Sequence, residues 1–224
     1  MIVSRDNERL KLVRKLADRR WREKLALFAV EGEDLVEAAR GAGIEPVDLL
    51  VAGEDVAPEL LAEVSSLGHP PRVVGVYRRD DLPRGVRPLT LALWRVADPG
   101  NVGTLLRTAD AFGAGVAISA GSADLTGPKA LRASMGGVFR VPTAAFEDAP
   151  EPWVALVPRG GTPLPELELA DRVSFILGAE REGLPDEVLR RCSARATIPQ
   201  PGPAESLNVA AAGAIALYEA SRGS

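Results

Sequence analysis

Short apolar runs alternate with segments of helical periodicity along this chain, and that alternation limits the fold to a sheet with mostly parallel strands. The run 89–96 is nearly continuous in apolar residues, as expected of a strand buried on both faces. A helix is predicted after it at 102–112. Further strands are expected at 115–119, 153–157, 173–177 and 194–198, and further helices at 128–134 and 209–220. The predicted class is α/β.

A smaller α/β unit is expected before that sheet. Leu10, Val13, Ala17 and Trp21 recur at helical spacing and predict one amphipathic basic helix with its arginines outward. Strands at 28–30, 47–51 and 73–76 and helices at 34–42 and 58–67 are expected to follow it. The periodicity breaks between residues 78 and 88. The predicted domains are therefore 1–80 and 89–224, joined by a linker at 81–88.

Composition excludes several classes of protein. Hydrophobic residues make up 46% and charged residues 26%, as in ordinary globular domains, and no apolar run approaches the ~20 residues of a membrane span. The first 24 residues are charged throughout, so no signal peptide is expected and the predicted location is the cytoplasm. Cys192 is the sole cysteine and His69 the sole histidine, so neither a disulfide nor a metal site is expected.

The charge distribution favours a nucleic-acid partner despite a net charge of −4. Residues 1–24 carry nine basic and four acidic side chains, a local charge of +5, which leaves −9 for the remainder. Local basic patches determine phosphate affinity more than overall charge does. A solvated helix face that happens to be basic is the alternative. The basic residues predicted to bind RNA are Arg5, Arg9, Lys15, Arg19, Arg20, Arg22, Lys129 and Arg132.

Three polar segments, at 101–107, 178–183 and 198–208, follow expected strands and precede loops or helices. Ligands bind at the carboxyl ends of strands in open α/β sheets, so these segments are predicted to form one pocket. Simple helix capping is the alternative for Asn101, Ser206 or Asn208. Arg107 needs an anionic partner, either an internal carboxylate such as Glu180 or an RNA phosphate.

Glycines frame the second segment, and other nucleotide-binding signals are absent. Gly178 and Gly183 permit a tight turn and close backbone approach to a ligand. The sequence has no P-loop and no Gly-x-Gly-x-x-Gly, because Gly113-Ala-Gly115 leads into a strand. No histidine is placed to activate Cys192, so a packed or surface thiol is expected there.

The chain resembles the SpoU/TrmH family of RNA ribose 2′-O-methyltransferases over nearly its whole length. Residues 98–113, 175–184 and 198–209 resemble its three motifs, in order, over about 110 residues. Residues 131–142 resemble a segment of the ribosomal RNA enzymes, and Phe28-Ala-Val-Glu-Gly32 resembles a ribosomal-protein-like RNA-binding extension. The resemblance implies S-adenosylmethionine as cofactor, a deep trefoil knot in the C-terminal domain, and a homodimer whose interface helps to build the active site.

The resemblance also implies roles for residues at matching positions. The catalytic pocket would be Asn101, Arg107, Glu180, Ser206 and Asn208. The cofactor would be held by Leu177, Gly178, Ala179, Gly183, Ile198 and Leu207. The chain departs from the family pattern at Gln200, where members usually have an apolar residue.

These features predict an RNA ribose 2′-O-methyltransferase, acting on ribosomal RNA, with residues 1–80 selecting the site. Three alternatives stay open at this stage. They are a transfer RNA methyltransferase, a non-catalytic RNA-binding module on the same scaffold, and an unrelated α/β enzyme acting on a small metabolite.

Overall fold

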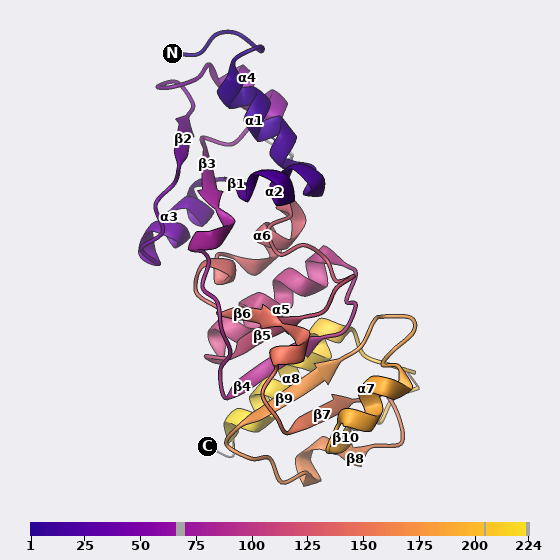
Figure 1. Ribbon diagram of the computed structural model, residues 1–224. Coiled ribbons are helices and arrows are strands. Elements are labelled where there is room, and N and C mark those ends of the chain that lie inside the picture. The colour runs from indigo at the N-terminus through magenta and orange to yellow at the C-terminus, as the bar shows by residue number, and fades with distance from the viewer. Residues whose placement is uncertain (66–69, 204, 223–224) are drawn as a thin grey trace.

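The computed structural model describes residues 1–65, 70–203 and 205–222, and two β-sheets organise them (Figure 1). The N-terminal unit, which runs from α1 to β3, has a three-stranded antiparallel sheet in the order β1-β3-β2. Its elements are α1 (Glu8–Leu16), α2 (Arg19–Leu25), β1 (Leu27–Glu31), α3 (Glu33–Gly41), β2 (Asp48–Val51), α4 (Pro58–Val64) and β3 (Val73–Arg78). The expected end of the helix at Leu67, and His69, lie outside the described residues.

The basic N-terminal segment forms two helices, and the prediction of one continuous helix is wrong. Asp18 interrupts it by capping α2, and its side chain accepts a hydrogen bond from the Arg20 N–H. Leu16 is buried at the end of α1, whereas Ala17, which was expected on the apolar face, is exposed. The break turns the second helix, so that Arg22 points inward instead of into solvent.

The C-terminal unit, from residue 89 onward, is built on a seven-stranded sheet. The strand order is β6-β5-β4-β9-β7-β10-β8, and every pairing is parallel, which confirms the predicted class. The strands are β4 (Leu89–Leu93), β5 (Gly115–Ile118), β6 (Thr143–Ala145), β7 (Trp153–Leu156), β8 (Thr162–Pro163), β9 (Val173–Leu177) and β10 (Ala194–Thr197). The helices are α5 (Pro99–Ala111), α6 (Pro128–Ser134), α7 (Asp186–Arg191) and α8 (Val209–Arg222). The trefoil knot stays a prediction.

Both faces of this sheet are buried, which explains the continuous apolar runs in its central strands. Leu91 of β4 packs in the core that includes Leu105 of α5 and Leu217 of α8. Its neighbour Ala92 packs in a second core, with Val188 of α7. Because successive side chains of a strand point to opposite faces, α5 and α8 cover one face and α7 covers the other.

Helix α8 packs closely on α5 through a glycine. A Cβ at Gly213 would lie 2.4 Å from Leu105 Cδ2, so a larger residue would push the two helices apart. One face of α8 is buried, but Ile215 and Tyr218 on the other are 38% and 56% exposed. Packing within one chain thus explains the apolar residues on the buried face of α8, but not Ile215 and Tyr218 on its exposed face. No helix in the described ranges is both long and apolar enough to span a bilayer.

Three C-terminal elements escaped prediction. Strands β6 and β8 have three and two residues, which is too short to show a period of two. Helix α7 has six residues, mostly charged, with Val188 as its one buried side chain.

An aromatic cluster joins the two units. Phe28 of β1 and Tyr77 of β3 stack at 5.8 Å, and Phe139 of the C-terminal unit packs on them at 6.1 and 5.6 Å. Burial raises the pKa of Tyr77 to about 12. Gly136 allows the close approach, since its φ is +85° and a Cβ there would lie 2.4 Å from the Cβ of Ala38. The apolar core is therefore continuous across the junction.

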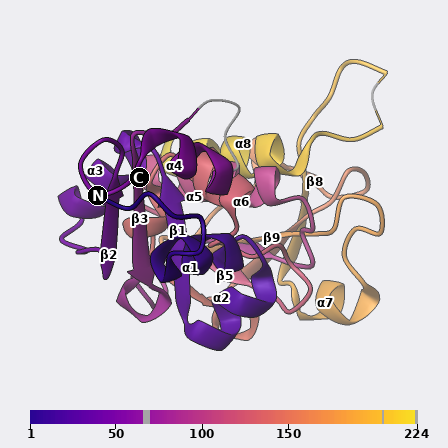
Figure 2. The same cartoon turned by 90° about the horizontal axis from the view of Figure 1, so that it is seen from above.

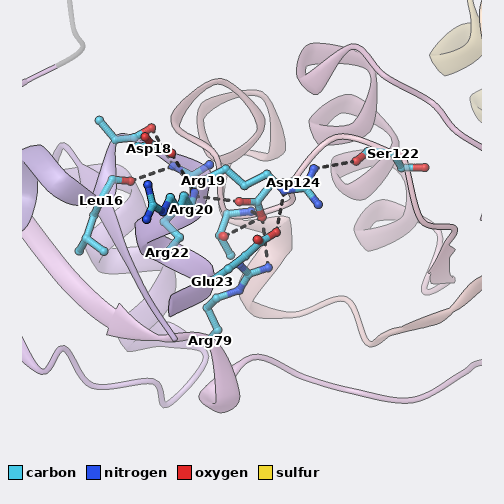
Figure 3. A network of polar contacts seen from close by, with 11 residues as sticks. Leu16, Asp18, Arg19, Arg20, Arg22, Glu23, Arg79, Ser122 and Asp124 are labelled. Carbon is cyan, nitrogen blue, oxygen red and sulfur yellow. Dashed lines mark hydrogen bonds and ion pairs between the residues drawn. The ribbon is translucent and has the colours of Figure 1, made fainter. Parts of the chain in front are cut away.

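A buried ion-pair network completes this junction (Figure 3). Arg22 Nε donates to Asp124 Oδ2 at 2.8 Å, and Arg79 Nη2 donates to Asp124 Oδ1 at 3.2 Å. The Arg22 and Asp124 side chains are 5% and 6% exposed. Arg22 also donates to the carbonyls of Leu16 and Ala17, at 2.8 Å each. The structure therefore corrects the prediction that Arg22 contacts RNA, because its donors are used inside the protein.

Asp124 stays ionised in this network. Desolvation raises its pKa, but hydrogen bonds from the Thr126 backbone and from Arg22, together with the charge of Arg79, outweigh burial and hold the pKa below its usual value. The carboxylate also accepts from the Thr126 hydroxyl at 2.8 Å. One acidic side chain thus ties the β5–α6 loop to two segments of the N-terminal unit.

Replacing Asp124 by Asn should destabilise the protein by about 3 kcal/mol or more, because breaking a buried ion pair leaves charge uncompensated. Urea unfolding at pH 7 measures the loss. The matched control is Asp171→Asn, at an exposed position, which should stay within about 0.5 kcal/mol of the wild type. A loss below about 1 kcal/mol for Asp124→Asn would contradict the role of the network.

Candidate active site

The three polar segments meet at one edge of the seven-stranded sheet. Parallel strands present all their carboxyl ends at the same edge, and there β9 leads into residues 178–183 and β10 into 198–208. Helix α5, which carries residues 101–107, starts at this edge after β4. The loop that precedes α8, drawn in yellow, extends away from the rest of the chain in Figure 2.

Side chains from the three segments form one hydrogen-bonded chain. Asn208 Nδ2 donates to Asn101 Oδ1 at 3.0 Å. Asn101 Nδ2 in turn donates to Glu180 Oε1 at 3.0 Å. These residues lie 107 and 79 positions apart in sequence. The fold therefore brings together three of the five residues that the resemblance assigned to catalysis.

Glu180 is held ionised at the centre of this arrangement. Its carboxylate also accepts from the N–H groups of Ala97 and Asp98, at 3.4 Å each. Desolvation raises the pKa of Glu180, but the hydrogen bond from Asn101 and those from backbone N–H groups outweigh it, so the pKa lies below its usual value. An ionised Glu180 can only accept, which fixes the Asn101 amide with its nitrogen toward Glu180 and its oxygen toward Asn208.

The capping alternatives resolve differently for the two asparagines. Asn208 does cap α8, since its Oδ1 accepts from the N–H groups of Ala210 and Ala211 at 2.9 and 3.3 Å. Asn101 does not cap α5. Asp98 takes that place and accepts from the Asn101 N–H at 3.0 Å, while Lys129 Nζ contacts its other oxygen at 2.8 Å. Asn101 thus keeps its whole side chain for Glu180 and Asn208.

A cavity of about 740 Å³ opens beside the hydrogen-bonded side chains of Asn208, Asn101 and Glu180. All six residues predicted to hold the cofactor line it, together with Glu180, Ser206 and Asn208. The six are Leu177, Gly178, Ala179, Gly183, Ile198 and Leu207. Sequence reasoning missed several apolar lining residues that are spread over separate elements, namely Leu156, Val157, Pro158 and Leu189.

The glycines of the second segment shape the cavity wall. A Cβ on Gly178 would lie 2.4 Å from the backbone of Gly183, and Gly183 has a φ of +66°. Its N–H donates to the carbonyl of Ala179 at 2.9 Å, which closes the turn. Both positions therefore require glycine, as the sequence indicated.

Gln200 has a side-chain oxygen that lacks a hydrogen bond from the described residues. It lines the cavity, and its Oε1 is buried without a hydrogen-bond partner among the described residues. A buried carbonyl oxygen left unpaired costs roughly 1–3 kcal/mol. A ligand that places a donor in the cavity would remove that cost.

Arg107 lies apart from these groups within one chain. It is exposed on α5, does not line the cavity, and has no hydrogen bond or ion pair with any described residue. Of the two partners considered for Arg107, the internal carboxylate of Glu180 does not pair with it within one chain, and Asn101 is the side chain that contacts Glu180. Six residues separate Arg107 from Asn101, which places them on different sides of the helix.

Most residues predicted to bind RNA are on the surface. Arg5 and Arg9 pair with Glu63 and Asp48. Lys15 lies over the Trp21 ring, with its Nζ 5.2 Å from the ring centroid. Arg19, Arg20 and Lys129 are exposed, Arg132 is half-buried, and Arg22 is the buried exception described above.

Comparison with known proteins identifies the two units. The profile of the SpoU rRNA Methylase family matches residues 88–218, and that of the MRM3-like substrate binding domain matches residues 7–76. The 23S rRNA (guanosine(2553)-2′-O)-methyltransferase RlmP of Bacillus subtilis is 31% identical, covering 97% of each chain.

Two solved structures are similar to this chain over nearly its full length. The AdoMet-bound rRNA methyltransferase from Sinorhizobium meliloti has a TM-score of 0.87 at 30% identity, covering 99% of this chain and 97% of that one. The SpoU methyltransferase AviRb from Streptomyces viridochromogenes, also in complex with AdoMet, has a TM-score of 0.85 at 27% identity, covering 97% and 98%.

Replacing Glu180 by Gln should lower the free energy of unfolding at pH 7 by about 1 kcal/mol, because the carboxylate accepts several N–H groups. The depressed pKa means that this stabilisation is fully present above the usual value of 4.5 and is lost as the pH falls through the lower folded value. The gap between variant and wild type should therefore close in acid. Urea unfolding across pH 3–7 tests this, with exposed Glu182→Gln as control, and a gap unchanged at pH 3 would contradict it.

Proposed function

Since the chain belongs to the SpoU rRNA methylase family, we propose that it transfers a methyl group from S-adenosylmethionine to a ribose 2′-hydroxyl of ribosomal RNA. The observation that carries this proposal is the row of hydrogen-bonded side chains Asn208, Asn101 and Glu180. It lies beside a cavity that is lined by the six residues predicted to bind the cofactor. A module that only bound RNA would need no such pocket.

The cavity residues fit S-adenosylmethionine. Apolar side chains from β7, β9 and β10 suit the flat adenine ring, and the close turn at Gly178 and Gly183 exposes backbone to a ligand. The buried Oε1 of Gln200 has no donor within the described part of the chain, and the cofactor carries amino and hydroxyl donors. When bound, the cofactor supplies a methyl group on a positively charged sulfur.

The protein's own residues then position and activate the ribose. Methylation would join the methyl carbon to the 2′-oxygen as that carbon left the sulfur, and the hydroxyl proton would pass to solvent water. Glu180, through Asn101, holds the amide of Asn208 in one orientation at the cavity. A guanidinium keeps its charge in nearly all protein settings, so Arg107 acts by stabilising the developing alkoxide and by aligning it with the methyl group.

A homodimer would bring Arg107 to the cavity. Arg107 is exposed on α5 and away from the cavity of its own chain. The neighbouring helix α8 presents Ile215 and Tyr218 to solvent, an apolar surface suited to a second copy of the same face. We place Arg107 of one protomer at the cavity of its partner.

Ribosomal RNA is favoured over transfer RNA by the extent of the similarity. The rRNA enzymes RlmP and AviRb match 97% of this chain, including the N-terminal unit. A structure described by its 2-OH methylation of C/U34 on tRNA matches 61% of this chain, with a TM-score of 0.55. Substrate choice accordingly depends on the N-terminal unit.

Transfer of labelled methyl from S-adenosylmethionine to unmodified ribosomal RNA, transfer RNA and assembled ribosomal subunits tests the function, followed by nucleoside analysis. A 2′-O-methylated nucleoside from ribosomal RNA is expected. Labelled transfer RNA alone would overturn the substrate class. RNA binding without labelling of any pool would instead favour a non-catalytic role.

Arg107→Ala should lower methyl transfer about 100-fold or more, as removal of one stabiliser of an oxyanion does, while cofactor affinity stays within about twofold. Calorimetric titration with S-adenosylmethionine separates the two effects. Mixed dimers of Arg107→Ala and Asn208→Ala chains should recover about a quarter of wild-type activity, since half of the dimers would carry one intact site. No recovery would contradict the placement of Arg107 across the dimer.

Gln200→Met should weaken S-adenosylmethionine binding about fivefold to tenfold, because the apolar side chain cannot accept a hydrogen bond from the cofactor. Calorimetry on the apo protein measures the change. Analogues of S-adenosylmethionine that lack the adenine amine or the amino-acid amine identify which amine donates to Gln200. Removing that amine should weaken binding to the wild type but not to Gln200→Met. Unchanged affinity in Gln200→Met would show that the amide faces no cofactor group.

A further inference from the structure

A second cavity lies between the two units, about 580 Å³ in volume, and the proposed reaction does not use it. Arg19 of α2, Arg79 after β3 and Arg84 of the connecting segment line it. The C-terminal unit contributes Ser119, Ser122 and Asp124 from the loop after β5, and Asp148. Figure 3 shows the side chains of Arg19, Arg79 and Asp124 converging there.

The buried part of this wall has an excess positive charge. Arg22 and Arg79 share the single carboxylate of Asp124, so two guanidinium groups face one acid. Asp124 also accepts from Thr126 and has little capacity left. Arg79 Nη1 is buried with no hydrogen-bond partner among the described residues. An unsatisfied donor on a partly buried cation is costly, and an anion in the cavity would satisfy it once a turn of the Arg79 side chain brings Nη1 to the cavity wall.

The other two arginines can turn toward such an anion. Arg19 pairs with Glu23 at 2.7 Å, and Arg84 pairs with Asp80, both four residues apart. All four side chains are more than half exposed. Exposed pairs of this kind contribute at most about 1 kcal/mol, so exchanging the carboxylate for a phosphate costs little. Arginine also binds phosphate through two parallel N–H groups.

This cavity and the cofactor cavity share the same edge of the sheet. The second cavity lies at the carboxyl ends of β5 and β6, and the cofactor cavity at those of β7, β9 and β10. Strands β5 and β9 flank β4, so they are two strand spacings apart, about 10 Å. Lys129, exposed beside Asp98 at the start of α5, adds a positive charge at the same edge.

We propose that the cavity between the units binds a backbone phosphate of the RNA strand whose target ribose lies at Glu180. Arg19 and Arg84 exchange their carboxylate partners for this phosphate, and the Nη1 of Arg79 donates to it. The inference rests on the proposed function for the identity of the strand. It gives the junction of the two units a direct part in substrate binding, a few nucleotides from the methylated ribose.

The salt dependence of RNA binding tests the proposal without requiring methyl transfer. The double variant Arg19→Gln, Arg84→Gln should bind unmodified ribosomal RNA about 5- to 10-fold more weakly near physiological salt. The slope of log affinity against log salt should become shallower by about 0.7 to 0.9, the loss of one phosphate contact. Both positions are exposed, so the variant is expected to fold, and affinity for S-adenosylmethionine should not change.

Arg40→Gln is the matched control, because Arg40 is also exposed and paired with a nearby carboxylate, Glu37, but lies on α3 away from the cavity. It should leave the slope unchanged. Equal slopes for the double variant and the wild type would overturn the proposal. A slope lowered equally by Arg40→Gln would also overturn it, since the effect would then be general charge.

A second arm distinguishes an RNA phosphate from free phosphate. Inorganic phosphate at 10 mM, compared with chloride at equal ionic strength, should raise the melting temperature of the apo protein by less than 1 °C. A larger rise that disappears in Arg79→Gln would assign the site to a free anion and overturn the RNA assignment. If the double variant shows the predicted slope change but the wild type methylates none of the RNA pools, the proposed function fails while the phosphate site stands.

Discussion

Parallel pairing of all seven C-terminal strands is the constraint on which the rest of the molecule depends. It requires helices on both faces, and it places every strand-to-helix junction at a single edge. Asn101, Glu180 and Asn208 are far apart in sequence and adjacent in space for this reason alone. Because each follows a different strand, a shift of one strand by two residues would separate the three side chains.

The N-terminal unit is fixed to that edge by two different kinds of contact. The first is the apolar contact of the aromatic cluster, Phe28, Tyr77 and Phe139, which does not fix the orientation of one unit relative to the other. The second is the pair of hydrogen bonds from Arg22 and Arg79 to Asp124. These fix the relative orientation of the two units, since guanidinium geometry allows few arrangements. The proposed selection of RNA by this unit requires a defined position relative to the cofactor cavity, and the aromatic cluster alone would let the two units slide against each other.

Sequence predicted most of this fold, and it predicted that the three polar segments meet, because both depend on local patterns. Apolar runs located the central strands, and motif order brought Asn101, Glu180 and Asn208 to one pocket. Contacts between residues far apart in the sequence leave no such local pattern. Arg22 read as one more surface arginine, because its burial depends on Asp18 ending one helix and on Asp124, about a hundred residues away. The apolar lining residues of the cofactor cavity are likewise indistinguishable from core in a sequence.

Two unsatisfied atoms show what the isolated chain lacks at this edge. Among the residues that the structure describes, Gln200 Oε1 has no donor in one cavity and Arg79 Nη1 has no acceptor in the other. Folding alone would favour an apolar side chain at position 200, because an unpaired buried polar group only costs stability. At position 79 the bond to Asp124 stabilises the fold, and Nη1 is the part of the guanidinium that this bond leaves over. Their opposite polarity matches ligands of opposite kind, a cationic cofactor rich in donors and an anionic strand. A strand that reached both cavities would have to run along the sheet edge, past Lys129 and Asn101, and would bring its ribose to the hydrogen-bonded chain that ends at Glu180.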